Sequence, residues 1–382
     1  MGATGTGISP PDPGASHLYV HIPFCHHICP YCGFYKHQPG NLANHEFVEA
    51  ILLDAERRSS DLSKNVKTVF FGGGTPSLLS PTHLERLCRK LAEILPLDQI
   101  EEWTLEANPA TFSPEKASLI RDLGVTRISL GVQSFQQKTL QTLGRDHSSK
   151  EAIESFDTLR NAGFDNVSID LMFSIPGQTR ELWANDLKQA IELEPDHISA
   201  YNLTYEEDTE FLARHKSGEL DSDEDRDADL FADAISKLTS AGFEHYEISN
   251  YARPGFESLH NQAYWAGKDY LGLGPSAVST IRGTRTTTIA DTAAYVKAAS
   301  SGLSTCSEIE ELSPEDLRIE RIALQLRTRE GIPRSLLPPM AEGQPSPVDA
   351  LVQEGMVRFE CDRLVLTESG KALADPIAAA LV

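Results

Sequence analysis

Strand-like runs alternate with amphipathic helical segments between residues 18 and 241. Each of six short runs rich in β-branched and aromatic residues is followed by a longer segment with apolar residues at helical spacing. The runs cover residues 18–22, 66–71, 103–106, 126–132, 167–173 and 197–203. This alternation predicts an α/β fold with a parallel sheet and right-handed crossovers. Six units are too few for a complete eight-stranded barrel, so the pattern fits either a three-quarter barrel or a doubly wound sheet.

Capping residues indicate where the helical segments begin. Ser80 stands before Pro81, where the missing N–H of proline costs nothing in the first helical turn. Ser148 and Glu151 have the spacing of a capping box, and Gly163 is placed to end the helix that follows.

Three cysteines directly follow the first strand-like run. Cys25, Cys29 and Cys32 are spaced C-x3-C-x2-C, which places three thiolates on one tight loop. Three cysteines can hold a [4Fe-4S] cubane and leave one iron open to a non-protein ligand. They can equally form a structural zinc site of the Cys3His type, because His26, His27 and His37 are close in sequence. The spacing alone does not distinguish these two chemistries.

Charge and cysteine usage limit the partners and the compartment. With 56 acidic and 34 basic residues, the formal charge of −22 disfavours nucleic acid and anionic lipid as partners. Cys88, Cys306 and Cys361 are scattered, which indicates a reduced compartment rather than a disulfide scaffold. Residues 1–16 lack the features of a secretory signal and are expected to form a flexible leader. No run approaches the roughly 18 apolar residues of a membrane span, so we expect a cytoplasmic protein.

Polar and glycine residues follow the ends of the predicted strands. Because the carboxyl ends of parallel strands share one face, these residues are expected to surround a single mouth. They are Gly72 to Pro76, Glu106, Gln133, Arg145, Asp170, Tyr201 and Asn202. Two carboxylates, a guanidinium and a carboxamide suit a ligand with amino, carboxylate and ribose hydroxyl groups. S-adenosylmethionine has all three, and its amino and carboxylate groups could chelate an open cluster iron. This ring favours the cluster over zinc.

Several motifs together resemble one protein family. The cysteine loop, Gly-Gly-Gly-Thr-Pro at 72–76, Glu-Ala-Asn-Pro at 106–109, Gly-Val-Gln-Ser-Phe at 131–135 and the run at 170–178 resemble the oxygen-independent coproporphyrinogen III oxidases of the radical S-adenosylmethionine superfamily. The resemblance extends from about residue 19 to the C-terminus. It implies a partial (β/α)6 barrel of the TIM type with a [4Fe-4S] cluster on Cys25, Cys29 and Cys32.

The same resemblance implies a set of S-adenosylmethionine contacts. Gln133 and Asp170 match positions near the ribose, while Arg145 and Glu106 match positions near the methionine end. The full set of matching positions is Tyr19, Tyr31, Gly73, Gly74, Thr75, Glu106, Gln133, Arg145 and Asp170.

One departure from the oxidase pattern points to a sister group. The oxidases carry a fourth cysteine at the position of Phe34, and the pattern with Phe34 resembles the HemW-type haem chaperones. His-Asn-Gln-Ala-Tyr-Trp at 260–265 matches the H-N-x-x-Y-W signature of that group. A neutral His260 imidazole could ligate haem iron, and Tyr264 with Trp265 could cover a macrocycle face. In the alternative interpretation His260 and Asn261 only cap a turn.

These observations predict four segments and one function. We expect the leader at 1–16, a radical S-adenosylmethionine partial barrel at 17–250, a barrel extension with the haem-binding stretch at 251–312, and a small winged-helix-like module at 313–382. The predicted function is that of a haem chaperone, which binds haem and transfers it to acceptor proteins. The alternative is an oxygen-independent coproporphyrinogen III oxidase acting in porphyrin biosynthesis. We assign a catalytic role to no side chain.

Overall fold

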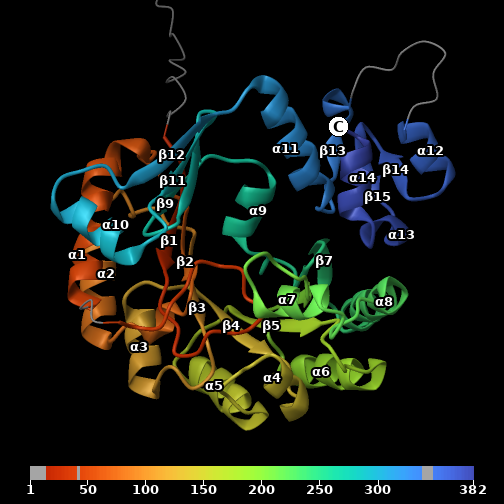
Figure 1. Ribbon diagram of the computed structural model, residues 1–382, viewed down its shortest axis with the longest axis horizontal. Coiled ribbons are helices and arrows are strands. Elements are labelled where there is room, and N and C mark those ends of the chain that lie inside the picture. The colour runs from red at the N-terminus through yellow and green to blue at the C-terminus, as the bar shows by residue number, and fades with distance from the viewer. Residues whose placement is uncertain (1–13, 41–43, 338–346) are drawn as a thin grey trace, which may run out of the picture.

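The computed structural model describes residues 14–40, 44–337 and 347–382. Its centre is a twelve-stranded sheet in which six parallel strands lie side by side in sequence order (Figure 1). These strands are β1 (His17–Ile22), β2 (Thr68–Gly73), β3 (Glu102–Ala107), β4 (Arg127–Gln133), β5 (Val167–Phe173) and β6 (His197–Asn202). When each strand lies next to the strand that follows it in the chain, right-handed crossovers place all the connecting helices on the same face of the sheet. The structure therefore adopts the three-quarter barrel and not the doubly wound sheet, which confirms the predicted fold class.

Helices follow the six strands in turn and cover the outside of the sheet. They are α1 (Asn44–Arg58), α2 (Pro81–Ile94), α3 (Pro114–Asp122), α5 (Ser149–Asn161), α6 (Arg180–Glu192) and α8 (Glu224–Ser240), with the shorter α4 (Gln137–Thr142) and α7 (Glu210–Lys216). The caps predicted from sequence are present. Ser80 Oγ accepts a hydrogen bond from the His83 N–H, and Ser148 with Glu151 forms a reciprocal capping box. Short 3-10 turns cover Ser59–Asp61 and Pro76–Leu78.

Each parallel strand presents an apolar face to the helices and a more polar face to the barrel interior. In β4, Ile128, Leu130 and Val132 belong to the main hydrophobic core. Arg127, Ser129, Gly131 and Gln133 alternate with them and line an internal cavity. Successive residues of a strand point to opposite faces of the sheet, so this period of two separates core from lumen.

The sheet does not close, and further strands extend both edges. On one side β1 pairs in parallel with β9 (Tyr270–Leu273), which is followed by the antiparallel strands β10 (Val278–Ile281), β11 (Thr284–Thr288) and β12 (Cys306–Glu311). On the other side β6 pairs with β8 (Asn250–Ala252), and β8 pairs with β7 (Glu244–Glu247). Helix α10 (Thr292–Ser300) packs on α1.

Helix α9 (Leu259–Trp265) contains the H-N-x-x-Y-W stretch and lies against the N-terminal ends of the parallel strands. The Glu102 carboxylate at the start of β3 accepts hydrogen bonds from the N–H groups of Leu259 and His260, at 2.9 and 3.0 Å. It also accepts one from Ser258 Oγ at 3.4 Å. An anionic side chain at a helix N-terminus is favourable. The helix therefore covers the end of the lumen opposite to the cysteine loop.

The C-terminal segment forms a small unit with its own apolar cluster, which includes Ile322, Leu326, Leu364 and Ile377. Its elements are α11 (Pro314–Leu326), β13 (Ile332–Pro333), a 3-10 turn (Arg334–Leu336), α12 (Pro347–Gln353), β14 (Val357–Glu360), β15 (Arg363–Leu366), α13 (Glu368–Lys371) and α14 (Ala374–Ala380). The strands form a three-stranded antiparallel sheet. The unit combines helices with a β-hairpin formed by β14 and β15, while the predicted domain boundaries remain predictions.

The structure differs from the predicted leader at residues 14–16. Residues 1–13 lie outside the described residues, but residues 14–16 are packed on the barrel. Ala15 is fully buried and bridges to Leu62, and its N–H donates to Asp61 O at 2.9 Å. Residues 14–16 therefore do not belong to a free leader. The expectation failed because Ala15 and Ser16 are small residues that nothing in the local sequence pattern marks as strand.

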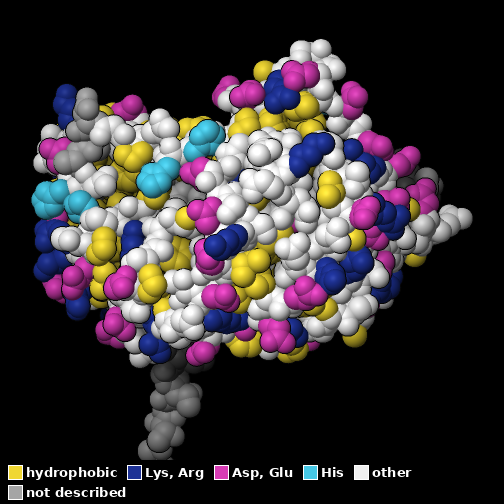
Figure 2. All heavy atoms as spheres, turned by 90° about the horizontal axis from the view of Figure 1, so that it is seen from below, with side chains coloured by type: hydrophobic (Ala, Val, Ile, Leu, Met, Phe, Trp, Pro, Cys, Tyr) yellow, Lys and Arg dark blue, Asp and Glu magenta, His cyan; other side chains and the backbone are white. Residues whose placement is uncertain are grey.

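On the face that Figure 2 displays, acidic and basic side chains are interspersed. Within residues 14–40, 44–337 and 347–382, no helix combines the length and the apolar character needed to cross a bilayer.

Glu102, which is 3% exposed, holds the start of α9 against the sheet. We therefore expect its substitution to lower the stability of the protein. Glu102→Gln keeps the size of the side chain but removes the charge that the α9 N-terminus contacts. We expect the free energy of unfolding to fall by ~1.5–3 kcal/mol, because hydrogen bonds to charged groups have about this strength. Urea denaturation measures the change. The neighbouring Glu101→Gln is the matched control, since Glu101 is half exposed and forms a surface ion pair with Lys67. Equal effects of both substitutions would contradict the prediction.

Candidate functional site

The cysteine loop follows β1 and is braced by two neighbouring segments. The Cys25 N–H donates to His37 O at 3.0 Å, and the Cys32 N–H donates to Cys29 O at 3.2 Å. From the glycine loop, the Gly74 N–H donates to Ile22 O and the Thr75 N–H to Phe24 O, both at 2.8 Å. The loop that carries the three thiols is therefore fixed by backbone hydrogen bonds on both sides.

Glycine is required in the second loop because the cysteine loop packs so closely on it. A Cβ at Gly73, which has φ +106°, would lie 2.4 Å from the His21 ring. A Cβ at Gly74 would lie 2.7 Å from the carbonyl carbon of Pro23. Both glycines line the internal cavity, but the Gly73 N–H donates to Glu106 Oε2 at 3.2 Å, and the Gly74 N–H is used by Ile22. These glycines thus position the cysteine loop as well as forming the cavity wall.

A chain of hydrogen bonds connects two of the three cysteines. Thr75 Oγ1 donates to Cys25 Sγ at 3.7 Å and accepts from Asn108 Nδ2 at 2.8 Å. Asn108 Oδ1 accepts from Arg145 Nη2 at 2.6 Å, and Arg145 Nη1 donates to Cys29 Sγ at 3.6 Å. Donors aimed at sulfur stabilise its negative charge. Asn108 was missed by the sequence reasoning, although it is part of the Glu-Ala-Asn-Pro motif that carried Glu106.

The donor set fits a cluster held by three thiolates. Burial raises the pKa of the Cys25 and Cys32 thiols, so both need a cation to become thiolates at neutral pH. Across the part of the chain that the structure describes, no three His, Cys, Asp or Glu side chains converge on a point suitable for a single metal ion. A cubane takes one thiolate at each of three irons, so its ligands surround a body rather than a point. Cys25, Cys29 and Cys32 would hold it.

Two buried carboxyl groups face the lumen beneath the cysteine loop. Burial raises the pKa of Glu106 to about 8, with a further increase from nearby Asp170. Glu106 is therefore largely protonated at pH 7 until a cation such as an ammonium group arrives. Burial also raises the pKa of Asp170. Ser129 Oγ donates to both carboxyl oxygens at 2.9 Å, and this contact lowers the pKa and so opposes the effect of burial. Glu106 suits the amino end of S-adenosylmethionine, and Asp170 suits hydroxyl donors.

Gln133 occupies a strained position at the end of β4. Its φ is +66°, in the left-handed region, and the β4–β5 register shifts between Leu130 and Gln133. Such irregularities turn a side chain away from the ordinary strand direction and are common at functional sites. Gln133 lines the same cavity as Glu106 and Asp170.

One cavity of about 570 Å³ joins these groups and runs from the cysteine loop to helix α9. It is lined by every residue predicted to bind the cluster or S-adenosylmethionine except Tyr19, and it is not lined by His260. The predicted residues on its wall are Cys25, Cys29, Tyr31, Cys32, Gly73, Gly74, Thr75, Glu106, Gln133, Arg145 and Asp170. Sequence reasoning missed Arg127, Ser129 and Ser199, which line the deeper part. Their signal was only the period of two within each strand.

Tyr19 acts on the site through other residues. Its hydroxyl lies 3.0 Å from His21 Nδ1, and His21 Nε2 lies 2.7 Å from Tyr35 O, just beyond the cysteines. Burial raises the pKa of Tyr19 and lowers that of His21, so both are neutral near pH 7. Tyr19 therefore supports the cysteine loop from inside the barrel and is not part of the cavity wall. It is a positioning residue in the observed arrangement.

His260 lies beneath the lumen and shares one hydroxyl with a second histidine. Thr68 Oγ1 is 2.7 Å from His260 Nδ1 and 2.9 Å from His17 Nδ1. Burial lowers the pKa of His260 to about 3 and that of His17 to about 4, so both rings are neutral. A threonine hydroxyl has one proton, so when it donates to one ring it accepts from the other. The start of α9 is capped by the side chains of Ser258 and Glu102, and not by those of His260 and Asn261, which the alternative interpretation of this motif expected.

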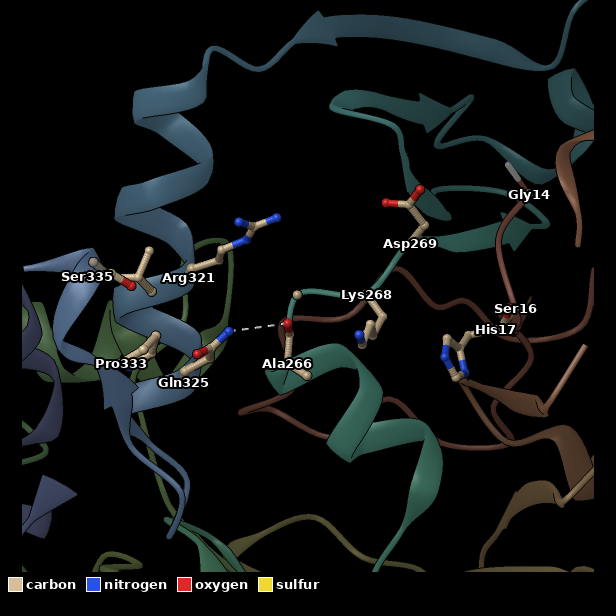
Figure 3. Close-up of a pocket in the computed structure, with 12 residues that line it drawn as sticks. Gly14, Ser16, His17, Ala266, Lys268, Asp269, Arg321, Gln325, Pro333 and Ser335 are labelled. Atoms are coloured by element: carbon tan, nitrogen blue, oxygen red, sulfur yellow. Dashed lines mark hydrogen bonds between the residues drawn. The ribbon is translucent and has the colours of Figure 1, made fainter. Parts of the chain in front are cut away.

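A second cavity of about 570 Å³ lies between the start of β1, the end of α9 and the C-terminal unit (Figure 3). Figure 3 shows Lys268, Asp269, Arg321 and His17 around it, and the Gln325 side chain reaching Ala266 O at 3.4 Å. It is more exposed than the lumen and lies at the opposite end of the barrel from the cysteines.

Comparisons with known proteins agree with this site. Residues 19–190 match the model of the radical SAM superfamily, whose chemistry combines a [4Fe-4S] cluster with S-adenosylmethionine. The chain is 38% identical over 315 residues to the haem chaperone HemW of Lactococcus lactis, covering 82% of each chain. It is 33% identical over 367 residues to the HemW of Bacillus subtilis, covering 94% of this chain and 97% of that one.

Among solved structures, coproporphyrinogen III oxidase (HemN) from Escherichia coli matches with a TM-score of 0.82. The match covers 97% of this chain and 90% of that chain at 24% identity, so it shows a shared fold. Together with the matched superfamily, these relationships exclude a structural zinc knuckle as the purpose of the cysteine loop. The chain belongs to the HemW family of the radical S-adenosylmethionine superfamily.

Proposed function

We propose that this protein binds haem and transfers it to acceptor proteins, with a [4Fe-4S] cluster and S-adenosylmethionine at the mouth of its barrel. The observation that carries the proposal is the similarity to HemW haem chaperones over nearly the full length of both chains. A reduced, cytoplasmic setting fits this function, because all six cysteines, which lie in described segments, are free.

The residues of the mouth have separate tasks in this proposal. Cys25, Cys29 and Cys32 hold the cluster, and Arg145 and Glu106 bind the carboxylate and ammonium of the methionine end. Gln133 and Asp170 bind the ribose hydroxyls. When bound, the cluster and S-adenosylmethionine can supply one-electron chemistry. The buried Glu106 carboxyl, whose pKa is raised to about 8, becomes charged when a cation such as the ammonium group is present.

The residue at position 34 supports a carrier over an oxidase. Phe34 is 70% exposed and stands at the rim of the lumen cavity. In the oxidases that the chain resembles, a cysteine occupies this position and gives the loop a fourth thiol. Phe34 presents instead an exposed apolar ring, which suits contact with an acceptor protein.

Haem ligation by His260 is part of the proposal. The Nδ1 atom of His260 is already bonded to Thr68, which is the arrangement that usually orients a metal-binding imidazole. Nε2 is then the atom that would meet the iron. Because the ring is buried, with 9% exposure, haem reaches it only when α9 shifts away from the strand ends.

The central prediction concerns haem binding and porphyrinogen turnover. After anaerobic reconstitution of the cluster, we expect saturable haem binding in a haemin titration followed in the Soret band. We expect no conversion of coproporphyrinogen III in the presence of S-adenosylmethionine, and Phe34→Cys should leave haem binding unchanged. Formation of protoporphyrinogen by the unmodified chain would overturn the carrier proposal in favour of the oxidase.

A second prediction concerns Arg145, whose guanidinium is buried and contacts Asn108, Gly131 O and Cys29. Arg145→Lys keeps the charge but loses the fork that binds a carboxylate with two parallel hydrogen bonds. We expect affinity for S-adenosylmethionine to fall by about ten- to hundredfold, since such bonds contribute roughly 1.5–3 kcal/mol. Equilibrium binding to the reconstituted protein measures this, with iron content as a check on the cluster. Arg89→Lys on the exposed side of α2 is the control, and equal affinities for the two variants would refute the assignment.

A third prediction separates ligation from packing at His260. His260→Ala should abolish the Soret shift on haem addition but leave S-adenosylmethionine affinity intact. Thr68→Val keeps the imidazole and removes only its hydrogen bond, so haem binding should persist with reduced affinity. If His260→Ala carried and delivered haem normally, the ligand assignment would be wrong and the residue would serve only the α9 start.

A further inference from the structure

Arg127 is a buried cation without a partner. It is the first residue of β4, its side chain lines the lumen cavity, and it is 2% exposed. Its Nε has no hydrogen-bond acceptor, and in the described part of the chain no carboxylate forms an ion pair with its guanidinium. An arginine side chain stays protonated in a protein, so the charge cannot be avoided by titration. Burying such a charge without a counter-ion is costly.

The carboxyl groups in and beside the lumen already have hydrogen-bond donors from the protein. Glu102 accepts three hydrogen bonds from the start of α9, and Asp170 accepts from Ser129 and Ser168. Glu106 accepts from the Gly73 N–H and is neutral near pH 7. Arg127 influences Glu106, Asp170 and His260 through space but contacts none of them as an ion pair. The Arg145 guanidinium, which is also buried, donates to Asn108 Oδ1 and Gly131 O. Arg127 is therefore the guanidinium of the deeper lumen for which the described residues provide no direct hydrogen-bond or ion-pair partner.

The shape of the cavity indicates what kind of ligand reaches this charge. The cysteines lie at one end of the 570 Å³ cavity, and Arg127 lines its wall together with Asn261 from the covering helix α9. S-adenosylmethionine at the mouth would occupy much of this volume, so the remaining space admits an arm and not a macrocycle. Phe70 gives this part an apolar wall, while Ser129 and Ser199 offer hydroxyl groups. A short carbon chain that ends in an anion fits these surroundings.

We propose that the deep end of the lumen is a carboxylate subsite centred on Arg127, and that it receives a propionate arm of haem bound at the α9 end of the barrel. The second half of this statement rests on the proposed function. A guanidinium binds a carboxylate through two parallel hydrogen bonds, which matches the planar, unoccupied donor set of Arg127. The subsite explains why a charged residue is retained among the neutral groups beneath the cofactors.

The test compares haem with its dimethyl ester, which lacks the carboxylates, on the reconstituted full-length protein. The unmodified protein should bind haem about tenfold more tightly than the ester, because a carboxylate–guanidinium contact of this kind has roughly that effect. Arg127→Met should bind both compounds with the affinity of the ester. Arg127→Lys should restore part of the difference.

Two controls locate the carboxylate. Arg321→Met removes a cation from the second cavity, between α9 and the C-terminal unit, and should leave the preference for haem over the ester unchanged. If Arg321→Met abolished that preference and Arg127→Met did not, the propionates would lie in the second cavity and the lumen subsite would be wrong. Affinity for S-adenosylmethionine should be the same in Arg127→Met and in the unmodified protein. A large loss would assign Arg127 to the S-adenosylmethionine site and overturn the proposal.

A measurement without haem distinguishes failure of the subsite from failure of the proposed function. Sodium propionate should raise the unfolding temperature of the unmodified protein in a saturable way, compared with sodium chloride at equal ionic strength. Arg127→Met should fold, with an unfolding temperature at or above that of the unmodified protein, and should not respond to propionate. Equal responses of the two proteins would exclude the carboxylate subsite, whether or not the protein binds haem.

Discussion

The inner face of the parallel sheet is the constraint on which the rest of the structure depends. Apolar residues of the six strands face the helices and form the main core, so the intervening residues face a lumen that the core cannot fill. Several of these residues are charged or strongly polar, and buried polar groups must find partners. Helix α9 supplies partners for Glu102 at one end, and the serines of β4 and β5 supply them for Asp170. The buried polar groups of the lumen that have no such partner define the ligand site.

The mouth of the barrel shows how a loop with little regular structure is held in place. Backbone hydrogen bonds connect it to the glycine loop, and the absence of Cβ atoms at Gly73 and Gly74 permits the close approach. Thr75, Asn108 and Arg145 connect Cys25 to Cys29 through side chains from three different segments. The position of the thiols is therefore a property of the assembled barrel. A change in any one of these segments is transmitted to the sulfur atoms.

Haem and the radical cofactors impose different demands on this architecture. The cysteine loop, Glu106 and Asp170 form a polar mouth suited to small ligands, whereas the stretch at 260–265 lies at the other end of the strands. His260 and His17 share the hydroxyl of Thr68, so a change in the hydrogen bonding of one ring alters the tautomer of the other. Helix α9 is thus the element that would couple haem binding to the barrel floor.

Local signals in the sequence were sufficient for the helices and strands, whereas the chemistry predicted for the mouth depended on several motifs taken together. The period of the apolar residues, the serine caps and the three-cysteine spacing act within a few residues of one another, and the structure has the helices and strands that they predict. Tertiary structure alone decided the sequential strand order that makes a barrel, the docking of residues 14–16, and the indirect role of Tyr19. It also decided the contacts of Asn108 and the isolation of Arg127. These features join residues that are distant in the chain, and no local periodicity or cap records which distant groups will meet in the folded interior.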